Sequence, residues 1–285
     1  MKKLFMLILV GMLILIPVGG CSGDEENSIT AFCGAASKPA LDEAALAFTE
    51  ATGIKVYLNF GGSGTMLSQL KIAKEGDLYI PGSPDYMIKA ERDDIVYTDS
   101  DKILAYLVPA ILVQEGNPKN IQSLADLVKP GIEVAIGDPM SVCVGLYAYE
   151  ILEANGLIDD IKKAGTFVTY AESCEKTASL IVLKAVDAVI GWDVFASWNP
   201  DTTDVVYLEP DQIPRLSYVP GAICTFTKNR ANAQKFLDYL ASPAGQAIFS
   251  KWGYLTTEDE ARQYAPDAEI GGEYIIPDDY VPLVK

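Results

Sequence analysis

Runs typical of strands alternate with runs typical of helices along most of the chain, and this alternation restricts the fold more than any other feature. "SITAFCGAA" predicts a strand, "ALDEAALAFTEATG" predicts a helix from the spacing of its apolar residues, and "IKVYLNF" predicts a second strand. Strands that alternate with helices favour a largely parallel sheet covered by helices. The sequence therefore predicts an α/β fold.

A long apolar stretch divides this alternation into two series. It covers residues 101–118, "DKILAYLVPAILVQEGNP", is broken by Pro109, and can serve as a crossing between two lobes. Later, "SYVPGAICTFT" predicts a returning strand, and two helices split at Ser242-Pro243 follow it. A chain of 285 residues is long enough for two modest lobes. We predict one lobe from residues 29–106 with 222–285 and a second from 107–221, while the acidic stretch after residue 254 shows no clear pattern.

The N-terminus has the features of a secretory signal. Lys2 and Lys3 precede an apolar run over residues 4–18, which is short and terminal for a membrane span. The following "VGGC" resembles a lipobox, in which Cys21 would be lipidated. We predict a lipoprotein signal peptide over 1–20, a linker over 21–28 after lipidated Cys21, and an extracytoplasmic protein anchored to the cell membrane. An uncleaved anchor followed by an ordinary cysteine is the alternative, and it gives the same location.

The composition argues against several function classes. The chain has no histidine, which excludes a Ser-His-Asp triad, a Cys-His pair and histidine metal sites. A formal charge of −17 argues against nucleic acid as a partner. The five cysteines form no CxxC pair, so a zinc site is not expected. We expect no enzyme and no cofactor; Ser63 as a nucleophile would need Lys71 as its base, two helical turns away.

Glycine-rich and serine-containing loops suggest an anion site. In "FGGSGT", backbone N–H groups lead into a helix N-terminus, and Ser63 can donate a hydroxyl hydrogen bond. "CGAASKPALDE", with Ser37, also joins a strand to a helix, and similar junctions occur at "IGDPMSVCVGLYAYE" and "YAESCEKTASL". Each could equally be a plain turn or a helix cap. Two junctions in each half can converge in a cleft between lobes.

With these junctions in view, the chain resembles the periplasmic molybdate-binding proteins of ABC importers. The resemblance covers residues 29–254 and is carried by "AASKPALDEAALAFTEATGIKV", "FGGSGTMLSQL", "NPKNIQSLADLVKPGIEVAIGDP" and "KFLDYLASPAGQAIFSKWGY". It implies the type II periplasmic-binding-protein fold, with two lobes, each a mixed sheet flanked by helices, joined by a hinge around an interlobe ligand cleft. It also implies an extracytoplasmic monomer that passes molybdate or tungstate to an ABC permease and its ATPase.

The family holds its tetrahedral oxyanion with uncharged donors, and the resemblance transfers them residue by residue. Two serine hydroxyls fall on Ser37 and Ser63, and two backbone N–H groups fall on Val144 and Cys174. The family's tyrosine falls on Trp192, a departure that leaves the fifth contact and the substrate open, because an indole N–H donates from a different position. A metal is expected only as the centre of the bound oxyanion.

Several alternatives remain open at this level. An archaeal branch of the family coordinates the metal through acidic residues, but the matching positions here are Val142 and Gly191, which cannot coordinate. The same fold could bind sulfate, a phosphate-like anion or another small solute, and a purely structural lipoprotein is a further possibility. Cys143 and Cys174 lie at predicted contacts, either as a disulfide or as free buried thiols.

Overall fold

The structure is a computed structural model that describes residues 27–283. The predicted signal peptide and Cys21 lie outside the described residues, as does the predicted linker except for Asn27 and Ser28. Within the described part, no helix is both long and apolar enough to cross a membrane.

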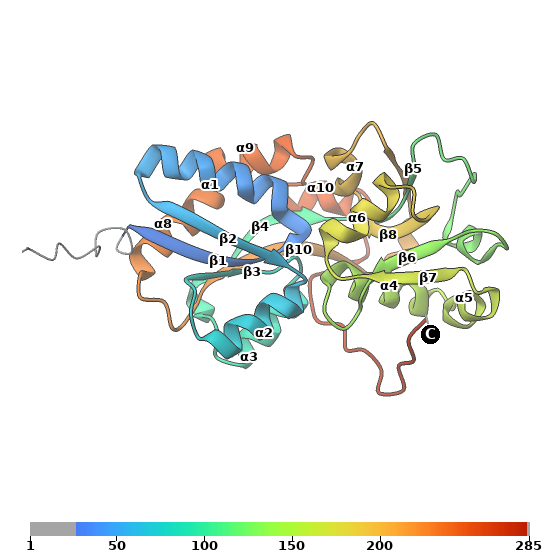
Figure 1. The fold of residues 1–285 in the computed structure, drawn as a ribbon, viewed down its shortest axis with the longest axis horizontal. Coiled ribbons are helices and arrows are strands. Elements are labelled where there is room, and N and C mark those ends of the chain that lie inside the picture. The colour runs from blue at the N-terminus through green and yellow to red at the C-terminus, as the bar shows by residue number, and fades with distance from the viewer. Residues whose placement is uncertain (1–26, 284–285) are drawn as a thin grey trace, which may run out of the picture.

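The first of two sheets carries the N-terminal strands (Figure 1). The order is β11-β10-β3-β1-β2, with β4 also paired to β10. Strand β1 pairs in parallel with both β2 and β3, whereas β10 runs antiparallel to β3 and β4. The strands are β1 (Ser28–Gly34), β2 (Lys55–Gly61), β3 (Leu78–Ile80), β4 (Lys102–Leu107), β10 (Arg215–Ile223) and β11 (Glu269–Ile270).

The second sheet has the order β7-β6-β8-β5-β9. Strand β6 pairs in parallel with β7 and β8, and β5 runs antiparallel to β8 and β9. Its strands are β5 (Pro109–Gln114), β6 (Val134–Gly137), β7 (Phe167–Ala171), β8 (Ala188–Trp192) and β9 (Thr203–Tyr207). Both sheets are therefore mixed.

Helices cover both faces of each sheet, so each sheet with its helices forms a lobe (Figure 1). In the first lobe α1, α8 and α9 lie on one face and α2 and α3 on the other; in the second, α6 and α7 lie opposite α4 and α5.

The α-helices are α1 (Lys38–Thr52), α2 (Ser63–Ala73), α3 (Pro84–Arg92), α4 (Cys143–Ala154), α5 (Ile158–Ala164), α6 (Cys174–Val182), α7 (Val194–Trp198), α8 (Arg230–Leu240), α9 (Pro243–Lys251) and α10 (Glu258–Arg262). The 3-10 helices are η1 (Ala35–Ser37), η2 (Thr98–Ser100), η3 (Leu124–Val128) and η4 (Pro210–Gln212). The predicted α/β architecture is confirmed.

Helix α1 illustrates why these segments fold as they do. Pro39 lies in its first turn, and its apolar residues, including Leu41, Ala44 and Phe48, are buried against the sheet. The helix ends at Gly53, whose φ of 73° is left-handed and whose N–H donates to the carbonyl of Thr49. Periodicity and end signals thus agree with the helix predicted from "ALDEAALAFTEATG".

The chain changes lobe where the apolar stretch contains its proline. Strand β4 ends at Leu107, Val108 is fully buried, and β5 begins at Pro109 in the other sheet. The chain returns between β9 and β10, and all of β10, from Arg215, pairs within the first sheet. The predicted lobe boundaries stay a prediction, but strand membership identifies these two crossings.

The C-terminal stretch that showed no pattern lies across both lobes. Strand β11 extends the first sheet beside β10, and Glu273 forms an ion pair with Arg92 of α3. The Tyr274 hydroxyl donates to Glu153 of α4 at 2.6 Å, and the hydroxyls of Tyr280 and Tyr170 of β7 lie 3.1 Å apart. We call residues 269–283 the C-terminal strap.

Candidate functional site

The loops that end the strands of the two sheets meet between the lobes. The backbone N–H of Gly64, in the first turn of α2, donates to the carbonyl of Ser141, before α4, at 2.9 Å. A Cβ added to Gly62 would lie 2.7 Å from the Ser141 carbonyl oxygen and 2.9 Å from that of Glu172. The lobes are therefore in direct backbone contact here, and glycine is required for that approach.

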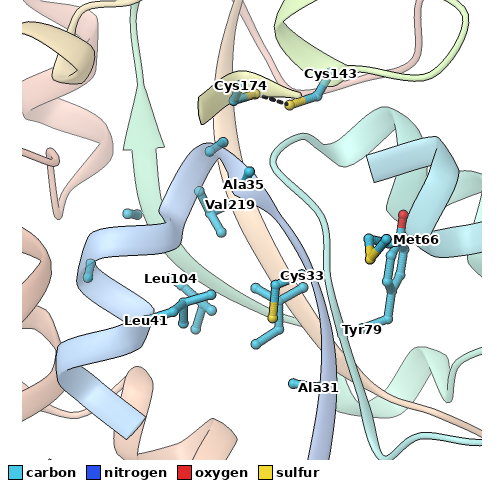
Figure 2. Packing of buried hydrophobic residues seen from close by; sticks show 14 of the residues in the cluster. Ala31, Cys33, Ala35, Leu41, Met66, Tyr79, Leu104, Cys143, Cys174 and Val219 are labelled. Atoms are coloured by element: carbon cyan, nitrogen blue, oxygen red, sulfur yellow. Dashed lines mark hydrogen bonds between the residues drawn. The ribbon is translucent and has the colours of Figure 1, made fainter. Parts of the chain in front are cut away.

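Two cysteines face each other at this contact. Cys143 is the first residue of α4 and Cys174 the first residue of α6, and both are fully buried free thiols. Their sulfurs point toward each other at 3.4 Å (Figure 2). Of the two readings open at the sequence level, the structure therefore has the free thiols.

Uncharged donors converge on these sulfurs. Burial raises the pKa of the Cys143 thiol, but Cys174 and the nearby donors of Ser63, Val144 and Trp192 together outweigh burial, so the net pKa is lowered. The same Val144 and Trp192 groups act on Cys174, whose pKa is nevertheless raised well above its usual value by burial and by Cys143. These groups stabilise negative charge at one point between the lobes.

Ser63 is held in place by the neighbouring junction. Its Oγ, fully buried, accepts the backbone N–H of Gly82 at 3.0 Å, which leaves the hydroxyl hydrogen free to donate elsewhere. A Cβ on Gly82 would lie 2.6 Å from both the Cys143 sulfur and the Ala36 Cβ. Gly82 thus brings the first lobe's loops against the second lobe.

Ser37 lies at the end of η1, which packs against α6 of the other lobe. Its hydroxyl is fully buried and donates only a long bond, 3.4 Å, to the carbonyl of Gly34. It precedes α1 without capping it through its side chain. A serine with this little internal bonding can turn its hydroxyl toward a ligand.

Trp192, at the end of β8, is fully buried and packs edge-on against Tyr147 at 4.9 Å between ring centroids. Its indole Nε1 has no hydrogen-bond partner, although it lies near enough to both thiols to affect their pKa. An unpaired buried donor costs roughly 1–3 kcal/mol unless a ligand satisfies it. Trp192 therefore combines core packing with an available donor.

The structure places the five residues predicted as anion contacts at these interlobe loops, and their role as contacts stays a prediction. We use "junction site" for these residues together with Cys143: Ser37, Ser63, Cys143, Val144, Cys174 and Trp192. The sequence reasoning considered Cys143 only as a disulfide partner or a free buried thiol and not as part of the ligand site, and it missed Gly82. The signal for Gly82 was present, because "PGSPD" is one more strand-to-helix junction with a glycine and a capping-type serine.

A groove of about 560 Å³ lies beside the junction site, between α1 and α9 of one lobe and α6 and α7 of the other. Its lining includes the carboxylates of Asp42, Glu43 and Glu175 and a single lysine, Lys38, which is paired with Asp42 at 2.9 Å. This charge is unfavourable for an anion. Nor does any cluster of three or more potential metal ligands (His, Cys, Asp or Glu) occur within residues 27–283.

Buried charges join the lobes next to this region. Arg215, at the start of β10, donates to Asp85 of α3 at 3.1 Å and pairs with Glu150 of α4 at 2.6 Å. Asp85 is fully buried and also accepts the N–H of Tyr274, and Arg215 further donates to the carbonyl of Gly271. One guanidinium thus connects both lobes and the C-terminal strap.

Asp193, which follows Trp192, gives a testable pH dependence. Burial raises its carboxyl pKa to about 7, and its Oδ1 accepts the N–H of Val194 at 2.8 Å. The folded protein therefore binds this proton more tightly than the unfolded chain, so the associated stability is present below about pH 4 and is lost as the pH rises through 7. In Asp193→Asn this loss should be absent. The free energy of unfolding of the variant, relative to that of the wild type, should therefore rise by up to about 4 kcal/mol between pH 4 and pH 8, as measured by urea unfolding.

Asp211→Asn, an exposed change, is the matched control and should follow the wild type at every pH. If the free energy of unfolding changed with pH in the same way for the wild type and Asp193→Asn, the raised pKa would be contradicted.

Comparison with known proteins adds to this geometry. Residues 29–255 match the family described as bacterial extracellular solute-binding protein. The molybdate-binding protein ModA of Escherichia coli is 24% identical over 261 residues, covering 89% of this chain and 99% of that protein. A Bacillus subtilis protein named a substrate-binding lipoprotein of an ABC transporter is 24% identical over 263 residues, with the same coverage.

Among solved structures, the sulfate-binding protein SubI of Mycobacterium tuberculosis superimposes with a TM-score of 0.72 at 20% identity. The match covers 86% of this chain and 94% of that one. At this identity the likeness shows the fold alone, and it confirms the predicted two-lobed binding-protein architecture.

Proposed function

Since the chain belongs to the family of bacterial extracellular solute-binding proteins, which serve ABC importers and are not enzymes, we propose that it captures molybdate or tungstate in the cleft between its lobes and delivers the anion to an ABC permease and its ATPase. The observation that carries the proposal is that buried, uncharged donors of both lobes meet where the lobes touch: Ser63 lies beside Gly64, which bonds to Ser141 of the other lobe, Val144 lies in the first turn of α4, and the Trp192 Nε1 is unpaired.

This kind of site suits a dianion even in an acidic protein. Fixed N–H and O–H dipoles in a water-poor cavity stabilise negative charge locally, so the net charge of −17 does not prevent binding. Helices α4 and α6 both begin at the junction site and add the partial positive charge of their N-termini.

The donors also explain which anions we expect to be rejected. Hydrogen phosphate carries a proton that needs an acceptor, and leaving it unpaired costs roughly 1–3 kcal/mol. Molybdate, tungstate and sulfate carry no such proton near neutral pH. The same donors suit sulfate, which likewise needs no acceptor, so sulfate is the principal competitor within this class.

We also propose that the protein is a monomer held at the outer face of the membrane by a lipid on Cys21. The "VGGC" sequence and the lipoprotein name of the Bacillus subtilis relative support this assignment. Labelling with radioactive palmitate tests it, because Cys21→Ser should abolish incorporation.

Isothermal titration calorimetry with molybdate, tungstate, sulfate and phosphate tests the ligand assignment. We expect tight binding of molybdate and tungstate and little response to phosphate. Tight phosphate binding would show that an acceptor faces the anion, and preference for sulfate would move the assignment to the smaller oxyanion. No heat with any of the four would reject the proposal.

Ser63→Ala should weaken molybdate binding by roughly 10- to 100-fold, the usual worth of a hydrogen bond to a charged group. The variant removes the hydroxyl donor at the junction site together with the acceptor for Gly82 N–H. Ser68→Ala, an exposed change on the same helix, is the control and should bind as the wild type does. Equal affinity of both variants would remove Ser63 from the contacts.

A further inference from the structure

Cys143 and Cys174 are placed differently from the other two described cysteines. Their sulfurs lie 3.4 Å apart at the first residues of two helices, inside the junction site. Cys33 pairs with Ile80 near one end of β3, while the N–H of Cys224 bonds to Asp77 at its other end. At roughly 3.3 Å per strand residue, Cys33 and Cys224 are too far apart along the sheet to be bridged.

We infer that Cys143 and Cys174 form a redox-active pair that converts between dithiol and disulfide, and that the disulfide form binds the oxyanion more tightly than the dithiol form. The second half of this inference rests on the proposed function. The first half does not, because it depends only on the placement of the two sulfurs.

The geometry requires little movement for the bond to form. A disulfide needs its sulfurs at roughly 2.05 Å, so the two atoms must approach by a little over 1 Å. Both cysteines belong to the second lobe, so bond formation needs no change in the angle between the lobes. Gly82 of the first lobe lies against the Cys143 sulfur, so exchange with an external reagent takes place when the lobes separate.

The chemistry is thiol-disulfide exchange with an external disulfide, either a small oxidised thiol or an oxidoreductase. The Cys143 thiolate attacks one sulfur of that disulfide, forms a mixed disulfide and releases the other sulfur as a thiolate. Cys174 then loses its proton and attacks the Cys143 sulfur, which forms the new bond and expels the second thiolate. The external disulfide takes up two electrons, and the two protons of the cysteines pass to the released thiols. The lowered pKa of Cys143 favours it as the attacking group.

The effect on binding follows from the donors. In the dithiol form the Cys143 sulfur lies beside the Ser63 hydroxyl, because Gly82 bonds to the Ser63 Oγ at 3.0 Å and a Cβ on Gly82 would lie 2.6 Å from that sulfur. Ser63 and the N–H of the adjacent Val144 lower the pKa of Cys143, and both are donors proposed for the anion. As a thiolate Cys143 also repels a dianion at short range. A disulfide sulfur is neutral and a weak acceptor, so oxidation releases these donors.

The test uses the full-length protein purified from membranes in mild detergent. It is equilibrated in buffers of glutathione and oxidised glutathione and then denatured in the presence of one alkylating reagent, because all four described thiols are buried in the folded protein. The disulfides are then reduced and labelled with a second reagent. Mapping of the peptides should show that Cys143 and Cys174 gain the second label together, while Cys33 and Cys224 keep the first. If Cys143 and Cys174 remain thiols in oxidised glutathione alone, the pair is not redox-active.

Calorimetry with molybdate then compares the oxidised and reduced protein, and we expect at least tenfold tighter binding by the oxidised form. Cys143→Ala removes the competing sulfur and should bind with the affinity of the oxidised wild type whether or not reductant is present. Equal binding by both wild-type forms would overturn the link to affinity while leaving the proposed function intact. Absence of binding to both molybdate and tungstate in both forms, with the disulfide mapped, would instead reject the proposed function and with it the link to affinity.

Discussion

Replacing Arg215 with methionine should lower the free energy of unfolding by about 3–5 kcal/mol, the cost of leaving a buried charge without its partner. Arg215 is almost completely buried and neutralises both Asp85, which has no exposed surface, and Glu150. Methionine fills similar space but leaves these carboxylates facing each other. The measurement is urea unfolding followed by circular dichroism at pH 7.

Arg92→Met is the matched control, because the exposed Arg92 pairs with Glu273 at the surface of α3, the helix that also carries Asp85. An exposed pair contributes little, so this variant should unfold close to the wild type. If Arg215→Met unfolds with the same free energy as the control, the negative charges of Asp85 and Glu150 are stabilised by other groups, such as the Tyr274 N–H.

Gly62→Ala should weaken molybdate binding by roughly 10- to 100-fold while leaving each lobe folded. The added methyl group would press on the carbonyl oxygens of Ser141 and Glu172, which are backbone atoms of the opposite lobe. Backbone atoms cannot move away as a flexible side chain can. The substitution therefore raises the free energy of the closed state, in which these loops touch. Calorimetry gives the affinity and circular dichroism verifies the fold.

Thr65→Ala, an exposed change one turn further along α2, serves as the control and should retain full affinity. Wild-type affinity in Gly62→Ala would mean that the anion binds without the close approach of these two loops.

Apolar periodicity and helix-end signals predicted much of the fold, because each depends only on residues that are neighbours in the sequence. The helix predicted after "FGGSGT" and the strand at "IKVYLNF" correspond to α2 and β2, and Ser242 caps α9 as its Ser-Pro sequence suggests. "SLADLV" folds as the 3-10 helix η3, in which Ser123 and Asp126 form a capping box around a single short turn. The C-terminal strap has no local period, because its position is fixed by partners more than a hundred residues away, such as Tyr170 and Glu153.

The site was partly predictable for a similar reason. Loops that follow parallel strands gather at one edge of their sheet, so Ser63 after β2 and Val144 after β6 each lie at such an edge, and a two-lobed fold whose loops face each other brings them together. The direction of the Cys143 side chain depends on how α4 and α6 begin relative to each other. Sequence pattern does not determine that geometry.

The C-terminal strap has a mechanical consequence for the transport cycle. Its adjacent residues Glu273 and Tyr274 hold Arg92 of one lobe and Glu153 of the other. Neighbouring Cα atoms are only about 3.8 Å apart, so the strap has almost no slack at this point. A wide swing of the lobes must therefore break a contact here. Because the N–H of Tyr274 also bonds to the buried Asp85 of the first lobe, the exposed bond from the Tyr274 hydroxyl to Glu153 is the contact that breaks on opening and re-forms on closure.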